Sequence, residues 1–301
     1  MIRLGLCCLF KQQPIKFSTT TATHLLKMSR EQQLLKLSNL CLSNAEALRQ
    51  AYGFCADTGI GCFRINSQIL PLKTHPQITY RVEDLPEGKK IIATFCECGK
   101  LLRQHGLRAS FHPDQFVVLN SPNPQTVANS LAEIEYQAEV AEWVGVDVIN
   151  VHGGGGYGDK KSALARFIEA FTQLSPAAQS RLTIENDDRT YTPAELLPVC
   201  RKLKIPLVYD VHHHRCLPDN LSLEKASDAA LQTWNREPMF HLSSPIEGWG
   251  GKQPHRHHDY IDPADFPEYW RSLTVDFTIE VEAKAKELAV LQLKRYITKA
   301  C

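Results

Sequence analysis

Short apolar runs rich in β-branched residues alternate along this chain with longer stretches in which apolar residues recur every three or four positions. The short runs predict buried strands, and the longer stretches predict amphipathic helices. From residue 60 onward, the expected strands span residues 62–70, 108–116, 146–152, 182–186, 206–211, 239–243 and 277–281. The expected helices lie near residues 90–105, 125–144, 161–174, 192–203, 222–235, 263–272 and 284–297. This alternation predicts a parallel sheet that is covered by helices.

The N-terminal 60 residues extend the same pattern. Residues 2–10 form an apolar run of strand length, and residues 30–58 have a helical pattern. Residues 1–30 also contain five basic residues, no acidic residue and many Ser and Thr, so a transit or signal peptide is the alternative to a first strand. With that strand, eight strand–helix units favour an α/β fold, a single closed (β/α)8 TIM barrel over residues 1–301. Two domains or an open doubly wound sheet are the alternatives.

The composition is that of an ordinary globular protein, with 43% hydrophobic and 22% charged residues, which excludes a disordered chain or a coiled coil. A formal net charge of +1 argues against a polycation that coats nucleic acid non-specifically, but it allows a local basic groove. No apolar run approaches the ~18 residues of a membrane span. The ten cysteines form no CxxC pair, so we expect free thiols in a reducing cytoplasm.

Imidazole and carboxylate side chains stand at or just beyond the ends of the expected strands. A single histidine at a strand end is usually structural, but six strands end in this way here, at His112, His152, Glu185, Asp210, His241 and Glu282. In a barrel the carboxyl ends of all strands converge on one mouth, so these side chains become neighbours. The set contains nitrogen and oxygen donors without cysteine, which predicts a site for two or three hard or borderline metal ions. The run 212–214 adds one or two further histidine ligands, and the pattern does not choose between them.

Two weaker signals concern a substrate rather than a metal. Arg64, Asn66 and Ser67 at the end of the second strand offer polar contacts for phosphate or sugar oxygens. Gln115 and Phe116, beyond His112, combine a hydrogen-bonding amide with a stacking ring. Such a pair of side chains can insert into a duplex and displace bases.

The chain resembles a known family, the UV damage endonucleases, which share a xylose-isomerase-like barrel. The resemblance extends along nearly the whole chain. The motifs that carry it are residues 2–5, 19–26, 63–67, 110–115, 150–154, 184–188, 209–214, 240–244, 257–260 and 281–284. So many motifs in order are specific, and the first also supports a strand at residues 2–10.

The resemblance implies a manganese-dependent endonuclease with two to three Mn²⁺ ions. It implies that Glu185 bridges ions and acts in catalysis together with Lys284. One ion would bind His112 and His152, a second Asp210, His241 and Glu282, and a third His213 with His257. Gln115 and Phe116 would probe the lesion within the duplex.

Two departures from the family pattern bear on this expectation. Some relatives carry a lysine, apparently modified to a carbamate near the metals, where this chain has Met239. Met239 cannot be modified in this way, so we expect the ion near His213 and His257 to bind more weakly. Relatives can also have Tyr and Asn where this chain has Leu6 and Phe10, which we keep as candidate lesion contacts.

The sequence thus predicts an endonuclease that incises DNA immediately 5′ of UV photoproducts, both cyclobutane dimers and 6-4 products, and leaves a 3′-hydroxyl and a 5′-phosphate. The expected partner is damaged double-stranded DNA, with no membrane and no organic cofactor. We expect a monomer in the cytoplasm, associated with the nucleoid. The alternatives are an abasic-site nuclease, a divalent-metal sugar isomerase on the same barrel, and a metal-dependent DNA-binding protein without activity.

Overall fold

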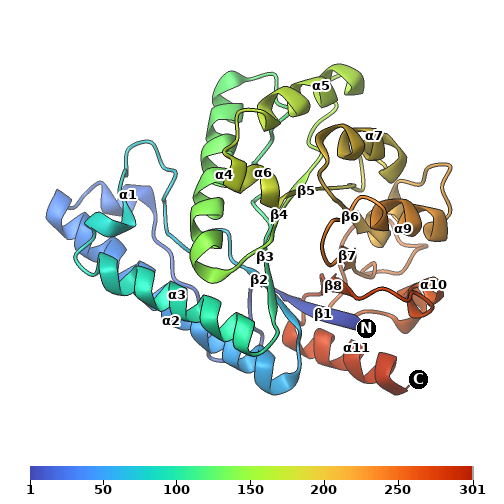
Figure 1. Ribbon diagram of the computed structural model, residues 1–301, viewed down its shortest axis with the longest axis horizontal. Coiled ribbons are helices and arrows are strands. Elements are labelled where there is room, and N and C mark those ends of the chain that lie inside the picture. Colours follow the sequence, from blue (N-terminus) through green and yellow to red (C-terminus); the bar gives the residue numbers. More distant parts are fainter. Residues whose placement is uncertain (300–301) are drawn as a thin grey trace.

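Eight parallel strands close into a barrel in the order in which they occur along the chain (Figure 1). The structure is a computed structural model and describes residues 1–299. The strands are β1 (Ile2–Cys7), β2 (Cys62–Ile65), β3 (Arg108–Phe111), β4 (Val148–His152), β5 (Leu182–Glu185), β6 (Leu207–Asp210), β7 (Met239–Leu242) and β8 (Phe277–Val281). β1 pairs with β2 on one side and with β8 on the other, which closes the ring. The predicted TIM barrel is confirmed.

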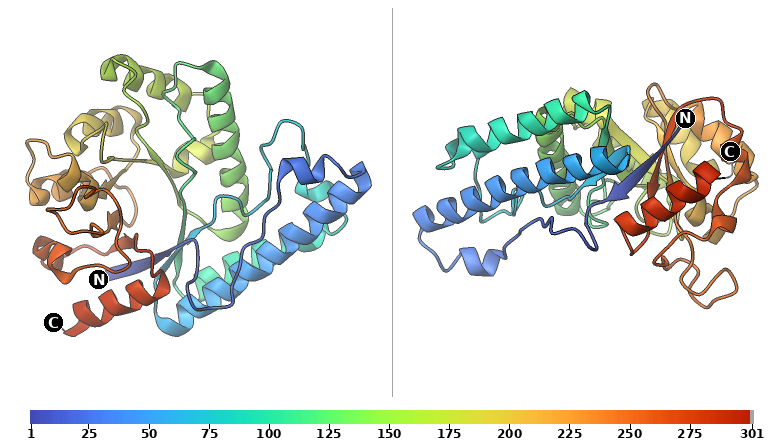
Figure 2. Two further views of the ribbon diagram at one scale, coloured as in Figure 1. Left: turned by 180° about the vertical axis from the view of Figure 1, so that it is seen from behind. Right: turned by 90° about the horizontal axis from the view of Figure 1, so that it is seen from below.

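Helices surround the barrel and connect its strands (Figures 1 and 2). The longer helices are α2 (Arg30–Thr58), α3 (Gly88–Gln104), α4 (Pro124–Val144), α5 (Lys160–Phe171), α7 (Pro193–Leu203), α9 (Leu223–Leu231) and α11 (Glu287–Lys299). Short helices are α1 (Ala22–Leu25), α6 (Pro176–Arg181), α8 (Val211–Cys216) and α10 (Glu268–Arg271), with 3₁₀ turns at Val82–Asp84 and Pro263–Asp265. α2 and α3 pack along each other and extend beyond the barrel (Figure 2). Within residues 1–299, no helix has both the length and the apolar character needed to cross a membrane.

Local sequence signals define where the longest helices begin and end. α2 begins with a capping box in which Ser29 and Gln32 satisfy each other's backbone N–H groups, and it ends at Gly59, whose φ is 67°. α4 begins after the Asn123 cap and ends at Gly145 with a φ of 78°. Because these signals fix each helix length, they also fix where the chain re-enters the barrel.

Three expected strands are shorter than the apolar runs that predicted them. The runs 2–10, 62–70 and 108–116 leave the barrel wall after Cys7, Ile65 and Phe111. Ile69 and Leu70 are buried, but beneath the loops at the barrel mouth rather than in the wall. The predicted strands were therefore too long, because apolar residues stay buried beyond the point where strand pairing stops. The helix expected at 263–272 is also wrong, because that segment forms a 3₁₀ turn followed by the four-residue α10.

The interior of the barrel contains ion pairs as well as apolar side chains. Arg108 donates to both carboxylate oxygens of Asp147 at 3.1 and 2.9 Å and to Thr278 at 3.1 Å. Met239 is fully buried in a small apolar cluster with Cys62, Val148 and Val208. This layer supports the strand ends, where the polar residues of the mouth begin.

Candidate metal centre

The structure brings seven of the eight predicted ligands together at the carboxyl ends of the strands. Their donor atoms form three groups in which every atom lies within 4.8 Å of the others. The groups are His112–His152–Glu185, His112–His241–Glu282 and Glu185–Asp210–His213. Since His112 and Glu185 each belong to two groups, the three form one continuous cluster.

The position of His213 follows from the way in which α8 begins. The Asp210 side chain caps this helix and accepts a hydrogen bond from the backbone N–H of His213 at 2.7 Å. The first turn therefore carries the His213 ring back over the end of β6, with its Nδ1 3.3 Å from Glu185 Oε1 and 3.5 Å from Asp210 Oδ2. A strand pattern could not choose among residues 212–214, because the choice is made by the start of a helix.

The two neighbouring histidines lie outside the three groups. His214 is held by the Tyr209 hydroxyl at 2.8 Å and by Asp219 at 3.0 Å. His212 lies against the backbone oxygen of Ser243 at 3.2 Å. Of the three, only His213 offers a nitrogen to the candidate metal site.

Several buried polar atoms of the cluster lack a hydrogen-bond partner. They are Nδ1 of His152, Oε1 of Glu185, Oδ2 of Asp210 and Nδ1 of His241. A buried polar atom without a partner is unfavourable by roughly 1–3 kcal/mol, so four in one cluster call for a shared partner. Imidazole nitrogen and carboxylate oxygen are ligands that suit Mn²⁺ and similar divalent ions. The residues present therefore fit a divalent metal centre.

The grouping of the ligands differs from the one that the family resemblance implied. Asp210 lies with Glu185 and His213, not with His241 and Glu282. β7 and β8 are neighbours, so Nδ1 of His241 comes within 3.4 Å of Glu282 Oε1, and His112 completes that group. His257 is in no group with His213: the two rings are 6.3 Å apart, and its Nδ1 lies 3.6 Å from Glu282 Oε2.

The charges of the cluster are compatible with cation binding. Burial raises the pKa of Glu185, but His241 and His152 outweigh it and hold that pKa well below its usual value. Glu185 is therefore anionic near neutral pH. Its Oε2 lies 3.1 Å from His112 and accepts a hydrogen bond from Asn150, while its Oε1 faces His213 and His241 at 3.3 and 3.2 Å. The two oxygens thus face different ligand groups.

Glu280 is a residue of the site that the sequence prediction missed. Its buried carboxylate accepts from Arg64 Nε at 2.6 Å and from the Ser110 hydroxyl, and it lies 3.1 Å from Nε2 of His241. Burial raises the pKa of Glu280, but Arg64 and His241 outweigh it and bring that pKa to about 2. Nη2 of Arg64 lies at the same distance of 3.1 Å from Nε2 of His241, so Glu280 and Arg64 together hold the Nε2 edge of the ring, and the Nδ1 edge faces Glu185 in the cluster. The available signal was the alternation along β8, which puts Glu280 on the same face as Glu282.

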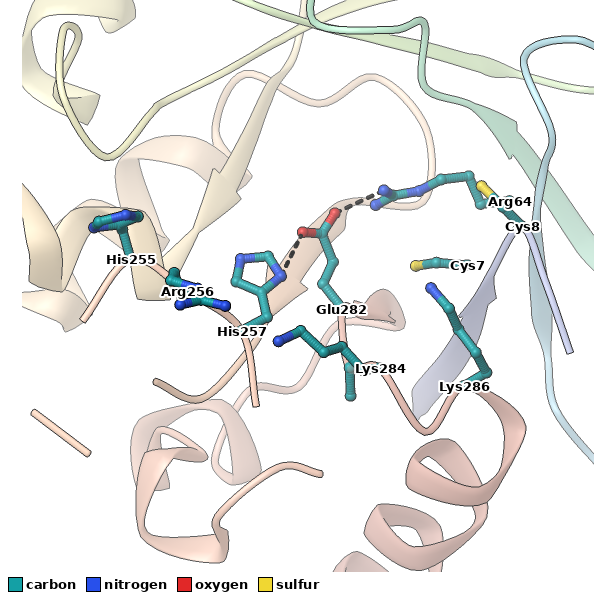
Figure 3. A pocket seen from close by; sticks show the side chains of 10 residues that line it. Cys7, Cys8, Arg64, His255, Arg256, His257, Glu282, Lys284 and Lys286 are labelled. Atoms are coloured by element: carbon teal, nitrogen blue, oxygen red, sulfur yellow. Dashed lines mark ion pairs between the residues drawn. The ribbon is translucent and has the colours of Figure 1, made fainter. Parts of the chain in front are cut away.

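Arg64 has a different environment from the one we expected. It is buried and forms ion pairs with Glu280 and with Glu282. Figure 3 shows the pair with Glu282, whose Oε1 lies 2.6 Å from Nη1 of Arg64. Both carboxylates hold the guanidinium inside the barrel, so it is not available to contact a DNA backbone in this structure. Asn66 and Ser67 remain at the mouth, where they line a small polar pocket with Thr19 and Asp114.

The candidate lesion contacts fall into two classes. Phe116 is 76% exposed on the loop that follows β3, next to Gln115, so its ring is free to contact a ligand. Leu6 is fully buried, and Phe10 packs against Phe54 and Phe63 with ring centroids 5.4 and 5.8 Å apart. These last contacts make Leu6 and Phe10 part of the core rather than of an open surface.

Comparisons with known proteins agree with the geometry. The family model described as UV-endonuclease UvdE matches residues 2–300. The chain is similar to the UV DNA damage endonuclease of Bacillus velezensis, with 35% identity over 297 residues that cover 95% of this chain and 89% of the relative. It is similar to the protein of the same name in Bacillus mycoides, with 35% identity over 91% of this chain and 87% of the relative.

Solved structures share the fold. The crystal structure of SacUVDE superposes with a TM-score of 0.88 and 28% identity and covers 100% of this chain and 99% of that one. Endonuclease IV from Thermus thermophilus shares the fold with a TM-score of 0.62 and 15% identity over 99% of this chain and 100% of that one. Because the family model matches nearly the whole chain, the protein belongs to the UV-endonuclease UvdE family.

Proposed function

We propose that this protein is a DNA repair endonuclease that incises the phosphodiester bond immediately 5′ of UV photoproducts and depends on Mn²⁺. The observation that carries the proposal is the continuous cluster of three ligand groups at the barrel mouth, in which His112 and Glu185 are shared. Ligands shared between neighbouring groups suit ions that act together on one phosphate. The relatives named UV DNA damage endonuclease support the choice of substrate.

Divalent ions bound in this cluster would supply a hydroxide nucleophile near neutral pH and offset the negative charge of the phosphate. The protein's own residues hold and orient the reacting groups. We assign Glu185 the task of joining two ligand groups, since its two oxygens face different histidines. We assign Lys284 the task of stabilising the departing 3′-oxygen, because it lies two residues beyond Glu282, a member of the ligand cluster. The products would be a 3′-hydroxyl and a 5′-phosphate.

Lesion recognition would use the exposed loop after β3. Photodamage weakens base stacking, so opening the duplex at a lesion requires less than the usual few kcal/mol. Phe116 would stack on the opened bases, and Gln115 would contact their edges. Asn66 and Ser67 would contact sugar or phosphate oxygens at the polar pocket that they line. The protein would act as a monomer on damaged duplex DNA, in the cytoplasm and close to the nucleoid.

A substrate panel tests the proposal against abasic-site cleavage. Duplexes that carry one cyclobutane dimer, one 6-4 product, one abasic site or no damage are incubated with the wild-type protein and with Phe116→Ala in Mn²⁺. We expect incision of both photoproduct duplexes by the wild type, and lower discrimination against intact DNA in the variant, since base–aromatic stacking contributes ~1–3 kcal/mol. Incision restricted to the abasic duplex would overturn the proposed substrate.

A further inference from the structure

A second feature of the mouth lies beside the metal ligands rather than among them. A cavity of about 520 Å³ adjoins Glu282 and His257 (Figure 3). Cys7 and Cys8 at the end of β1 form one wall together with Arg64 of β2, and the loop at residues 255–257 with the segment 282–286 forms the rest. Because Glu282 lines this cavity and also belongs to a ligand group, the cavity is continuous with the candidate metal centre.

The cavity has an excess of positive charge. Its lining includes Arg256, Lys284 and Lys286, and its one carboxylate, that of Glu282, is already contacted by Arg64 at 2.6 Å. Within residues 1–299, no ion pair involves Arg256, Lys284 or Lys286. Exposed lysines are commonly just solvated, but three uncompensated cations around one cavity favour an anionic ligand.

The backbone that carries these cations is held in place. The carbonyl of Arg256 accepts a hydrogen bond from Ile246 N–H at 2.7 Å, and Ser244 C=O accepts one from His258 N–H at the same distance. The N–H of Lys284 in turn donates to the carbonyl of His258 at 3.1 Å. The loop is therefore tied to the segments that follow both β7 and β8, so a ligand would find the backbone that carries the cations already ordered.

We propose that this cavity, which we call the flanking-phosphate pocket, binds the phosphodiester group adjacent to the scissile one on the incised strand. The proposal rests on the proposed function, since it requires a DNA strand whose scissile phosphate lies at the metal cluster. Such a strand carries a negative charge at every nucleotide, so the next phosphate along must lie close to the metal ligands. The pocket is the cationic cavity that adjoins them, and its volume is within the range of ordinary ligand sites.

The pocket would fix the register of the strand. A phosphate bound in this pocket sets where along the backbone the metal cluster can act, independently of the lesion contacts on the β3 loop. A protein cation that neutralises one phosphate also releases counterions from the DNA. Removing a cation of the pocket should therefore make the dependence of binding on salt shallower. The slope of log affinity against log salt should fall in magnitude by about 0.9.

The proposal can be tested by replacing a single phosphate next to the incision site with an uncharged analogue. Photodimer duplexes are made with a single methylphosphonate linkage on one or the other side of the incision site, and kcat/KM for incision is measured with the Mn²⁺-loaded protein. We expect the linkage on one side to lower kcat/KM of the wild type by about tenfold. The Lys286→Gln variant should show a similar loss of kcat/KM on the ordinary photodimer duplex. On the duplex with that linkage its kcat/KM should fall little further, because the variant and the linkage remove the same contact.

Two further variants complete the design. Arg256→Gln removes a second cation of the pocket and should reproduce the non-additivity even if Lys286→Gln does not fold. Lys100→Ala on α3 removes an exposed positive charge remote from the mouth, and its loss should be fully additive with either linkage. Additive losses for the Lys286 and Arg256 variants with both linkages would overturn the pocket while leaving the proposed function intact. Failure of the wild type to incise any photodimer duplex would overturn both.

Discussion

At the scale of single residues, the two oxygens of Glu185 divide their contacts. One faces His112 and accepts from Asn150, and the other faces His213 and His241. No other carboxylate belongs to two of the three ligand groups. Within the described residues, the cluster therefore depends on this carboxylate more than on either Asp210 or Glu282.

The substitution Glu185→Gln should abolish incision and leave binding to damaged DNA largely intact. An amide has the same shape but lacks the charge that holds two cations in place. Incision of a photodimer duplex, metal content and the midpoint of thermal unfolding are measured together. Retention of more than a few per cent of incision with unchanged metal content would remove Glu185 from the site.

A second substitution addresses the residue behind His241. We expect Glu280→Gln to raise the Mn²⁺ dissociation constant by ~10–100-fold, the usual effect of removing a hydrogen-bond partner of a metal-ligating histidine. Calorimetric titration of the metal-free protein measures it without reference to activity. Glu237→Gln is the matched control, because Glu237 is a partly buried carboxylate that pairs with Arg3 and accepts from Thr278 at the opposite end of β8. Equal Mn²⁺ affinity in both variants would show that Glu280 has only a structural role.

These two glutamates also show how far the sequence determines the site. Glu185 could be predicted, because it ends an apolar strand and all strand ends of a barrel converge. Glu280 and the ion pairs of Arg64 could not, because Arg64 and Glu280 are 216 positions apart and meet only across the closed barrel. Their pairing depends on strand register, which a single sequence does not specify.

At the scale of elements, periodicity located the strands, but the ends of the strands depended on other interactions. The apolar residues that follow β2 are buried under loops, so hydrophobicity does not mark the last ladder hydrogen bond. α8 was missed because it is a six-residue helix capped by the last residue of β6. Gly59 and Gly145, by contrast, mark the ends of α2 and α4 through their left-handed φ.

The helix ends allow a stability test with an internal control. Gly145→Ala should destabilise the protein by about 1 kcal/mol, since an alanine at a φ of 78° is strained although its Cβ would meet no atom closer than 3.8 Å. Gly53→Ala, in the interior of α2 with nothing within 4 Å of the added Cβ, should stabilise it by about 0.5–1 kcal/mol. Both are measured by urea denaturation. The same sign for the two variants would contradict the assignment of Gly145 as a conformational cap.

At the scale of the whole molecule, the formal net charge is +1, so DNA binding must come from local charge at the mouth rather than from the overall field. The three ligand groups draw on seven residues, and two of these residues are shared. The group with His241 has one carboxylate, Glu282, which Arg64 contacts, whereas the group with His213 has two. This distribution of charge predicts that an ion in the group with His241 and Glu282 binds more weakly than one in the group with His213.

Titration of the metal-free protein with Mn²⁺ should therefore show two tight equivalents and a third that is weaker. Buried Met239 adds no charge to the cluster, so neither binding nor activity should respond to added bicarbonate. Calorimetry gives the stoichiometry, and incision assays with and without bicarbonate give the second result. Three equally tight ions or a requirement for bicarbonate would show that another group supplies the missing charge.

Metal-dependent incision beside a photoproduct can be measured on a single labelled duplex. An end-labelled duplex with a single defined cyclobutane dimer is incubated with protein stripped of metal by a chelator, and then with the same protein after Mn²⁺ is restored. We predict no cleavage in the first case, and in the second a single product that ends immediately 5′ of the dimer in a 3′-hydroxyl that a polymerase can extend. Cleavage without metal, cleavage at another position, or an intact duplex in Mn²⁺ would contradict the proposed function.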